Sequence, residues 1–388
     1  MKPNVYLFSG INLLLFLGIY FPCLPEKHAT DAAAGDDFPA YCRYINRAAR
    51  AIYKNDFCQA AACYDSAFTK KRYPFYEDIR NSVLVNAKCG CYENNDARLR
   101  LLMLDMNVDT AFLFSEMPLR VFDAKNMVLI GNLEQRRRQQ NKKENDLQRS
   151  LRTMFTLDQE VRDYENVNMR DRQVSKMVYA KRDSLDKRQY HQFLALCGQY
   201  GFPTEEKTGA FYGEDLKWSE VVYVLLWHFV LSKSIEDKDA LVALFRKEAA
   251  AGNLQPSRYA SLLDMLHTRM PKPEYNFLNT TLCLVNNEAY RPFVFYSDSL
   301  MREINTNRIA AGLDSFHIVQ KQVVCQYFGK KSLDPQDMIP MAPAFNSIES
   351  LPYGLVKLSA DQANIDLDTY RINIDKILKE CNCREKVY

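Results

Sequence analysis

Glycine is scarce in this chain, with 13 residues among 388. So few glycines argue against a loop-rich β architecture and favour long helices, because glycine supplies the backbone freedom that tight turns need. A charge excess of either sign is missing too, since 51 basic and 48 acidic residues leave a net charge of +3. Nucleic-acid-binding proteins usually carry a clearer basic excess, so we expect no nucleic-acid partner.

Recognisable catalytic motifs are also missing. The sequence contains no H-E-x-x-H, no G-x-S-x-G, no phosphate-binding loop and no Cys/His spacing typical of structural zinc. We therefore expect no metal and no cofactor. The missing motifs favour a protein without catalytic activity and leave an enzyme of another type open.

An apolar run lies at the N-terminus. Residues 5–24 are almost wholly apolar, interrupted by Ser9 and Asn12. A run of this length suits an export signal or a single membrane anchor, so residues 1–35 are predicted to be one of these plus a linker. Lipidation at Cys23 and a buried helix in a cytosolic protein stay open. We expect an exported protein, periplasmic or held at the membrane only by residues 5–24.

Eleven cysteines are spread along the chain. Two C-x-C pairs, Cys89/Cys91 and Cys381/Cys383, could supply four thiolates, but zinc sites usually place two to four residues between paired cysteines. Exported proteins also form disulfides. We expect buried thiols together with one or two disulfides, whose pairing the sequence leaves open.

A helical hairpin is predicted near the start of the folded region. Residues 38–54 carry apolar side chains at three- and four-residue intervals, and a turn at Asn55 comes next. In the second helix Ala60 and Ala67 share one face, with Tyr64 between them. This spacing resembles the second helix of a tetratricopeptide hairpin, in which small residues let two helices approach closely.

Residues 36–125 as a whole are predicted to form tetratricopeptide-like helical hairpins, with a second, weaker hairpin over 76–106. So few repeats cannot bury their apolar faces alone, so we expect them to pack on the helices of the C-terminal domain. They would serve either as a concave surface for a peptide or protein partner or as a packing platform.

A strongly polar stretch is found at 126–150. Between Glu134 and Arg152 seven basic residues stand against three acidic ones, and neither Gly nor Pro interrupts the run. This pattern predicts a solvated, charged connecting helix. A basic patch for nucleic acid or lipid is less favoured, because no aromatic residues are interleaved with the charges.

Residues 151–328 are predicted to form a helical domain with at most minor β structure. The turn Tyr200-Gly201-Phe202-Pro203 ends one helix of this domain. The segment Val221–Leu231 is apolar on every side apart from His228, so we expect it to be the central buried helix. It is too short to cross a bilayer comfortably.

The C-terminal part carries weaker signals. Residues 279–296 are rich in β-branched and aromatic residues and suit a short strand pair. A helix is expected over 297–311, closed by Gly312. Residues 329–388 are predicted to be a Pro-rich loop followed by a C-terminal helix.

Several short motifs follow one another between Leu147 and Phe328. They are Asp158-Gln159-x-x-Arg162, Asp186 before the Tyr200 turn, Gly209 before the helix with His228, and Asn305-x-x-Arg308-x-x-x-Gly312-Leu313. In this order and spacing the segment resembles an uncharacterised bacterial domain common in Bacteroidetes. Members often carry an export signal and tetratricopeptide-like helices upstream. The family has no established activity, so the resemblance implies an architecture rather than a function.

This chain departs from the family pattern at three places. Trp227 stands where the family tends to have Gln, and Met265 comes after Asp264 where it tends to have Arg. The run Glu274-Tyr275-Asn276 replaces a Gln-x-Tyr-Gly run. These replacements would alter any ligand site that the family shares.

The candidate site residues all lie in this domain. Asp158, Asp186 and His228 are candidate catalytic residues, and Arg162 and Arg308 are candidate binding residues. A buried histidine is held neutral and could act as a base or a metal ligand, and a carboxylate beside it could orient its ring or complete a metal site. A lone buried histidine is more often a satisfied core group, however, and Asp/Arg pairs often fix helix packing. The packing role is favoured.

Two classes of function therefore stay open. The first is an uncharacterised exported helical protein with an interaction or scaffold role in the bacterial cell envelope, using its helical hairpins to bind a protein or peptide. The second is an envelope hydrolase or small-ligand-binding protein with a polar site around Asp158, Asp186 and His228. The missing catalytic motifs favour the first.

Overall fold

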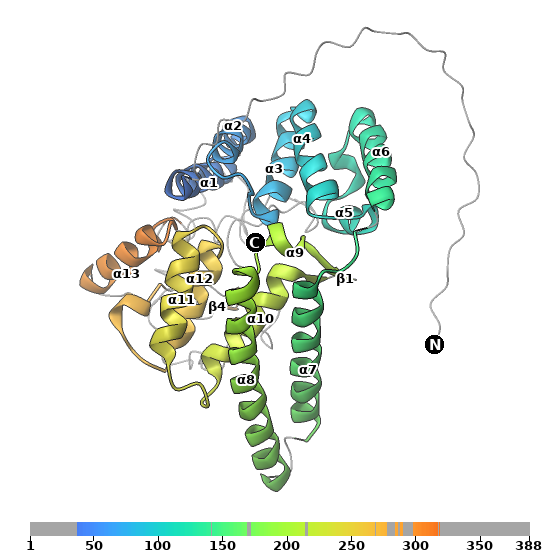
Figure 1. Ribbon diagram of the computed structural model, residues 1–388. Helices are drawn as coiled ribbons and strands as arrows, with labels where there is room; N and C mark the ends of the chain where they lie inside the picture. The colour runs from blue at the N-terminus through green and yellow to red at the C-terminus, as the bar shows by residue number, and fades with distance from the viewer. Residues whose placement is uncertain are drawn as a thin grey trace, which may run out of the picture. The chain divides into compact units, whose positions relative to one another are not determined.

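The computed structural model describes most of the chain between residues 37 and 318. The described ranges are 37–140, 142–168, 172–213, 216–267, 269–277, 284–285, 288–289, 298–316 and 318. Over these residues the protein is mainly α (Figure 1), which confirms the expected fold class. The expected export signal or anchor within 1–35, Cys23 and the expected tail at 329–388 lie outside them. In the described ranges, no helix combines the length and hydropathy that a membrane span requires.

The described elements are helices joined by short turns. In chain order the helices are α1 (Phe38–Tyr53), α2 (Phe57–Phe68), α3 (Tyr76–Cys89), α4 (Asn95–Arg100), α5 (Thr110–Glu116), α6 (Ala124–Gln140), α7 (Asp146–Asn168), α8 (Arg172–Tyr200), α9 (Glu205–Thr208), α10 (Trp218–Leu231), α11 (Lys238–Ala250), α12 (Pro256–His267) and α13 (Asp298–Ala310). Two antiparallel strand pairs are also present, β1 (Phe211–Gly213) with β2 (Leu216–Lys217) and β3 (Leu284–Val285) with β4 (Glu288–Ala289). The second pair lies within the region where a short strand pair is expected.

The helices α1 and α2 form a hairpin around Asn55. Asn55 has a φ of 59°, a left-handed conformation that asparagine tolerates better than most residues. Asp56 then caps α2, because its carboxylate accepts a hydrogen bond from the amide of Gln59. Ala60 and Ala67 are fully buried, so small side chains lie where the helices approach. The tetratricopeptide character of this hairpin stays a prediction.

The first apolar core lies among α1 to α6. Its largest fully buried members are Tyr76, Ile79, Leu99, Leu102 and Met103.

Cysteines occur here in both of the expected forms. A disulfide joins Cys58 of α2 to Cys89 of α3, while Cys42 and Cys63 are buried free thiols. The second C-x-C pair, Cys381/Cys383, lies outside the described residues.

The single connecting helix predicted over 126–150 is wrong, because two helices share this stretch. The first, α6, ends at Gln140, and α7 begins at Asp146. No Gly or Pro is needed for the break, since Asn145 and Gln148 cap α7 reciprocally. The Asn145 side chain accepts from the Gln148 amide (2.8 Å), and the Gln148 side chain accepts from the Asn145 amide (2.7 Å).

The second apolar core surrounds α10, with α7 and α8 side by side next to it (Figure 1). The α8 helix ends at the predicted turn, where Gly201 has a φ of +74°. Apolar side chains on several faces of α10 are buried, and the fully buried ones include Val221, Leu225, Leu226 and Phe229. The segment predicted to be the central buried helix is therefore central and buried.

A short segment between α9 and α10 connects the two cores. The amide of Ala210 donates to the carbonyl of Met106 (3.0 Å), and Ala210 is buried in the first core. The preceding Gly209 has a φ of +71°, and a Cβ there would lie 2.9 Å from the Met106 oxygen, so only glycine fits. Lys217 adds an ion pair with Glu77 of α3 (2.9 Å). Residues of the first core thus contact the segment that leads into the second core.

Candidate functional site

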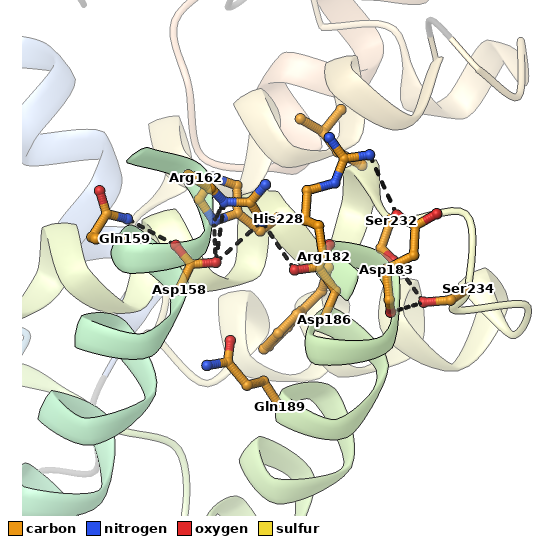
Figure 2. Close-up of polar contacts among 12 residues, drawn as sticks. Asp158, Gln159, Arg162, Arg182, Asp183, Asp186, Gln189, His228, Ser232 and Ser234 are labelled. Carbon is orange, nitrogen blue, oxygen red and sulfur yellow. Dashed lines mark hydrogen bonds and ion pairs between the residues drawn. The ribbon is translucent and has the colours of Figure 1, made fainter. Parts of the chain in front are cut away.

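Four of the sequence-predicted site residues meet between α7, α8 and α10 (Figure 2). Asp158 and Arg162 lie one turn apart on α7, so their side chains share a face of that helix. Asp186 comes from α8 and His228 from α10. We refer to these four residues as the polar cluster.

The guanidinium of Arg162 bonds to both carboxylates. Its Nη2 lies 3.0 Å from Asp186 Oδ1 and 3.1 Å from Asp158 Oδ1. On α10, His228 Nδ1 lies 2.9 Å from the same Asp158 oxygen. Arg162 therefore ties α7 to α8, and Asp158 ties α7 to α10.

One ring nitrogen of His228 has two neighbours, since Arg162 Nε also lies 2.9 Å from Nδ1. When the ring proton is on Nδ1, the imidazole donates to Asp158. When it is on Nε2, Nδ1 accepts from Arg162 instead. A neutral ring cannot do both, so the tautomer of His228 selects one of two hydrogen-bond arrangements.

The charges of Asp158 and His228 depend on burial and on the neighbouring groups. Burial would raise the pKa of Asp158, but His228 and Arg162 outweigh it and hold the pKa below its ordinary value. Burial lowers the pKa of His228, and Arg162 lowers it further, while Asp158 compensates only in part. At neutral pH the pair is therefore a carboxylate beside a neutral imidazole.

Asp186 differs from Asp158 in its bonding. Its side chain is 2% exposed. Oδ1 accepts from Arg162, whereas Oδ2 has no hydrogen-bond partner among the described residues. Burial raises the pKa of Asp186 to about 6, although Arg162 acts in the opposite direction. Asp186 therefore takes up a proton in mildly acidic solution.

Two glutamines belong to the same surroundings and were not predicted to be site residues. Gln159 Nε2 donates to the second oxygen of Asp158 (2.8 Å). Gln189 is 1% exposed, and its Nε2 donates to the Met154 carbonyl (2.7 Å). The spacing of Asp186 and Gln189, three residues apart on one helix face, is the signal that could have indicated the second glutamine.

Arg308 does not join the polar cluster. Its side chain lies on α13 and is 1% exposed. Nε donates to the Asp314 carbonyl (2.7 Å) and Nη1 to the Phe277 carbonyl (2.9 Å). Burial lowers the pKa of Arg308 to about 10. Its role is to hold α13 against the chain that leads from α12.

Two cavities lie away from the polar cluster, and none of its four residues lines either of them. One, of about 300 Å³, lies at the Phe202-Pro203 turn and the start of α10. The other, of about 690 Å³, lies between α1, α11 and the end of α13. We call the second the arginine groove, because its lining includes Arg43, Arg47, Arg50 and Arg246. Among the described residues, no group of three His, Cys, Asp or Glu side chains is arranged to hold a metal ion.

The polar cluster could act in two ways. An imidazole oriented by a carboxylate is the arrangement of a general base. A guanidinium between two buried carboxylates is also a common means of fixing helices together. Because the cluster groups bond mainly to one another, the geometry favours the second role.

Comparison with known proteins gives no relative. No family model matches the chain, and searches of curated proteins and of solved structures return no match. The resemblance to a Bacteroidetes domain and the expected export therefore stay predictions, and the function has to be argued from the geometry.

Proposed function

We propose that this chain is an exported helical interaction protein of the bacterial cell envelope that binds an acidic segment of a partner protein in the arginine groove. The observation that supports it is the arginine stripe on α1. Arg43, Arg47 and Arg50 are spaced four and three residues apart, so they lie along one exposed face of the helix. Arg246 of α11 lines the opposite side.

The groove has a strong excess of positive charge. Its lining contains four arginines and one acidic residue, Asp314, which pairs with Arg50. Arg47 lies over the ring of Tyr44 (5.5 Å), an arrangement that leaves the edge of a guanidinium able to donate to a carboxylate. A cleft lined by one sign of charge attracts ligands of the other sign and speeds their association.

The floor of the groove is apolar. Phe38, Cys42 and Tyr259 are buried beneath it, and Ile309 is 64% exposed at its edge. A segment that carries acidic residues around an apolar one would match both the rim and the floor. Such a segment places carboxylates on the arginines and an apolar side chain over the floor.

Peptide binding tests this proposal. We expect a fluorescent peptide of alternating glutamate and leucine to bind the wild-type protein, with an affinity that falls as salt rises. The double variant Arg43→Glu/Arg47→Glu should weaken binding at least about ten-fold, measured by fluorescence anisotropy. The matched control is Arg136→Glu/Arg188→Glu, which makes the same charge change at exposed positions on α6 and α8.

Two outcomes would contradict the proposal. Equal weakening by both double variants would show that net charge, not the groove, governs binding. Absence of binding to the wild-type protein would exclude an acidic segment as the ligand. In cells, a crosslinker at position 43 should trap a partner protein in the envelope, and should lose it on Arg47→Glu.

A further inference from the structure

Three cysteine sulfurs lie together at the disulfide that links α2 to α3. Cys58 and Cys89 form the disulfide, and the Sγ of Cys91 lies 3.0 Å from the Sγ of Cys89. A disulfide sulfur carries no proton, so the proton in this contact belongs to the Cys91 thiol. The contact therefore places a free thiol directly against one sulfur of a disulfide.

The backbone holds Cys91 in this position. Gly90 has a φ of +80° and ends α3, which turns the chain back toward the helix. The amide of Cys91 donates to the Asn86 carbonyl (2.9 Å), and its own carbonyl accepts from the Asn94 amide (3.2 Å). Cys91 is thus fixed on both sides of its Cα rather than placed by a long flexible loop.

Access distinguishes these sulfurs from the buried thiol of Cys42 on α1. Cys58 is exposed, and Cys89 and Cys91 are half-buried. Cys42, by contrast, is buried, and burial raises the pKa of its thiol to about 12, so it is inert at neutral pH. Solvent and other molecules can therefore reach the three grouped sulfurs.

We propose that Cys58, Cys89 and Cys91 form a thiol–disulfide exchange site whose substrates are disulfides of other molecules. In the first step the Cys91 thiolate attacks Cys89 Sγ, and a Cys89–Cys91 bond forms as the Cys58–Cys89 bond breaks. The electron pair leaves on Cys58 as a thiolate. Every bond formed replaces one broken, so the step needs no oxidant or reductant.

The released Cys58 thiolate is well placed to react onward. Cys58 is the second residue of α2, where the positive end of the helix dipole favours a thiolate as leaving group and nucleophile. It can attack an external disulfide, forming a mixed disulfide at Cys58 and releasing one external thiolate. This activity is independent of the arginine groove.

Disulfide mapping of the full chain tests the internal step. Trypsin should release residues 55–70, with Cys58 and Cys63, and residues 89–98, with Cys89 and Cys91. After thiols are blocked with iodoacetamide, we expect mass spectrometry to find two forms. One is a crosslink between the two peptides, and the other is an internal disulfide within 89–98.

Labelling with biotinylated oxidised glutathione tests the external step. We expect a mixed disulfide at Cys58 in the wild type, reduced about ten-fold in Cys91→Ser, which should hold only the 58–89 crosslink. The matched control, Cys63→Ser, removes a neighbouring buried thiol and should label as the wild type does. Circular dichroism checks that each variant is folded.

Either of two results would overturn the proposal. The first is equal labelling of Cys58 in wild type and Cys91→Ser. The second concerns the variant Cys58→Ser, in which Cys89 and Cys91 are both thiols. Glutathione disulfide should oxidise these two thiols to a Cys89–Cys91 disulfide. If those two thiols stay unpaired in this variant, the internal exchange does not occur.

Discussion

One ring nitrogen of His228 contacts both Asp158 and Arg162 of α7. Arg162 in turn bonds to Asp186 of α8, so replacement of His228 should disturb three helices at once. We expect His228→Gln to lower the free energy of unfolding by about 1–3 kcal/mol, because a buried carboxylate loses a well-placed partner. Urea denaturation monitored by circular dichroism measures this.

The control for this substitution is His191→Gln, at an exposed position of α8. It should change the free energy of unfolding by less than about 0.5 kcal/mol. If His228→Gln is as stable as the wild type, the packing role of the polar cluster is contradicted. Loss of hydrolysis or of ligand binding in such a stable variant would then support the alternative function, an envelope enzyme or ligand-binding protein.

Asp186 should make stability depend on pH in an unusual direction. Its pKa is about 6 in the folded protein, above the ordinary 3.8 of an unfolded aspartate, so the folded state binds more protons between these values. Stability from this group therefore falls as pH rises from about 4 to about 6, by up to roughly 3 kcal/mol. Burial of the charge is the cause.

Comparison with Asp186→Asn isolates this contribution. Asparagine does not titrate, so the variant should gain stability relative to the wild type as pH rises from 4 to 7. The lost ion pair with Arg162 shifts the whole curve but does not create that trend. Urea denaturation at several pH values measures the difference, and a constant difference across this range would contradict the raised pKa.

Single residues also show what the sequence could predict about the cluster. Residue type and order select Asp158, Arg162, Asp186 and His228, because buried carboxylates and cations need partners. The same logic fails for Arg308, whose partners are backbone carbonyls that any residue could supply. The two hydrogen bonds that compete for one nitrogen of His228 depend on distances, which no spacing in the sequence encodes.

Among the elements, the α1–α2 hairpin depends on small side chains. We expect Ala60→Leu to destabilise the protein by about 1–3 kcal/mol, because Ala60 is fully buried and a larger side chain overpacks the contact. Ala62→Leu on the exposed face of α2 is the matched control and should be nearly neutral. Thermal unfolding measures both, and equal behaviour would contradict close packing at Ala60.

Element boundaries could be predicted where a glycine or Asn55 marks a turn, but not between α6 and α7. Gly201 and Gly312 end α8 and α13 with positive φ, as their positions in the sequence predict. The break between α6 and α7 was missed because it rests on a reciprocal cap by Asn145 and Gln148 inside a polar run. A polar cap within polar sequence gives no change in composition, so the helical pattern runs through it.

For the whole molecule, the link between the two cores passes through Gly209. We expect Gly209→Ala to destabilise the protein by about 1–3 kcal/mol, since it strains a positive φ and drives a Cβ against the Met106 carbonyl. Gly198→Ala is the matched control, because a Cβ there meets nothing and alanine favours α8. It should be neutral or stabilising in urea denaturation. A neutral Gly209→Ala would mean that the segment can move away from Met106.

Both tryptophans of the chain, Trp218 and Trp227, lie in α10. The Trp227 indole stacks beside the His228 ring, with centroids 6.2 Å apart and planes 25° from parallel. A protonated imidazole quenches a neighbouring indole, whereas a neutral one does so far less. The protein therefore carries its own optical probe of the polar cluster: its ultraviolet emission should dim only at pH values below the usual titration range of histidine, since burial lowers the pKa of His228.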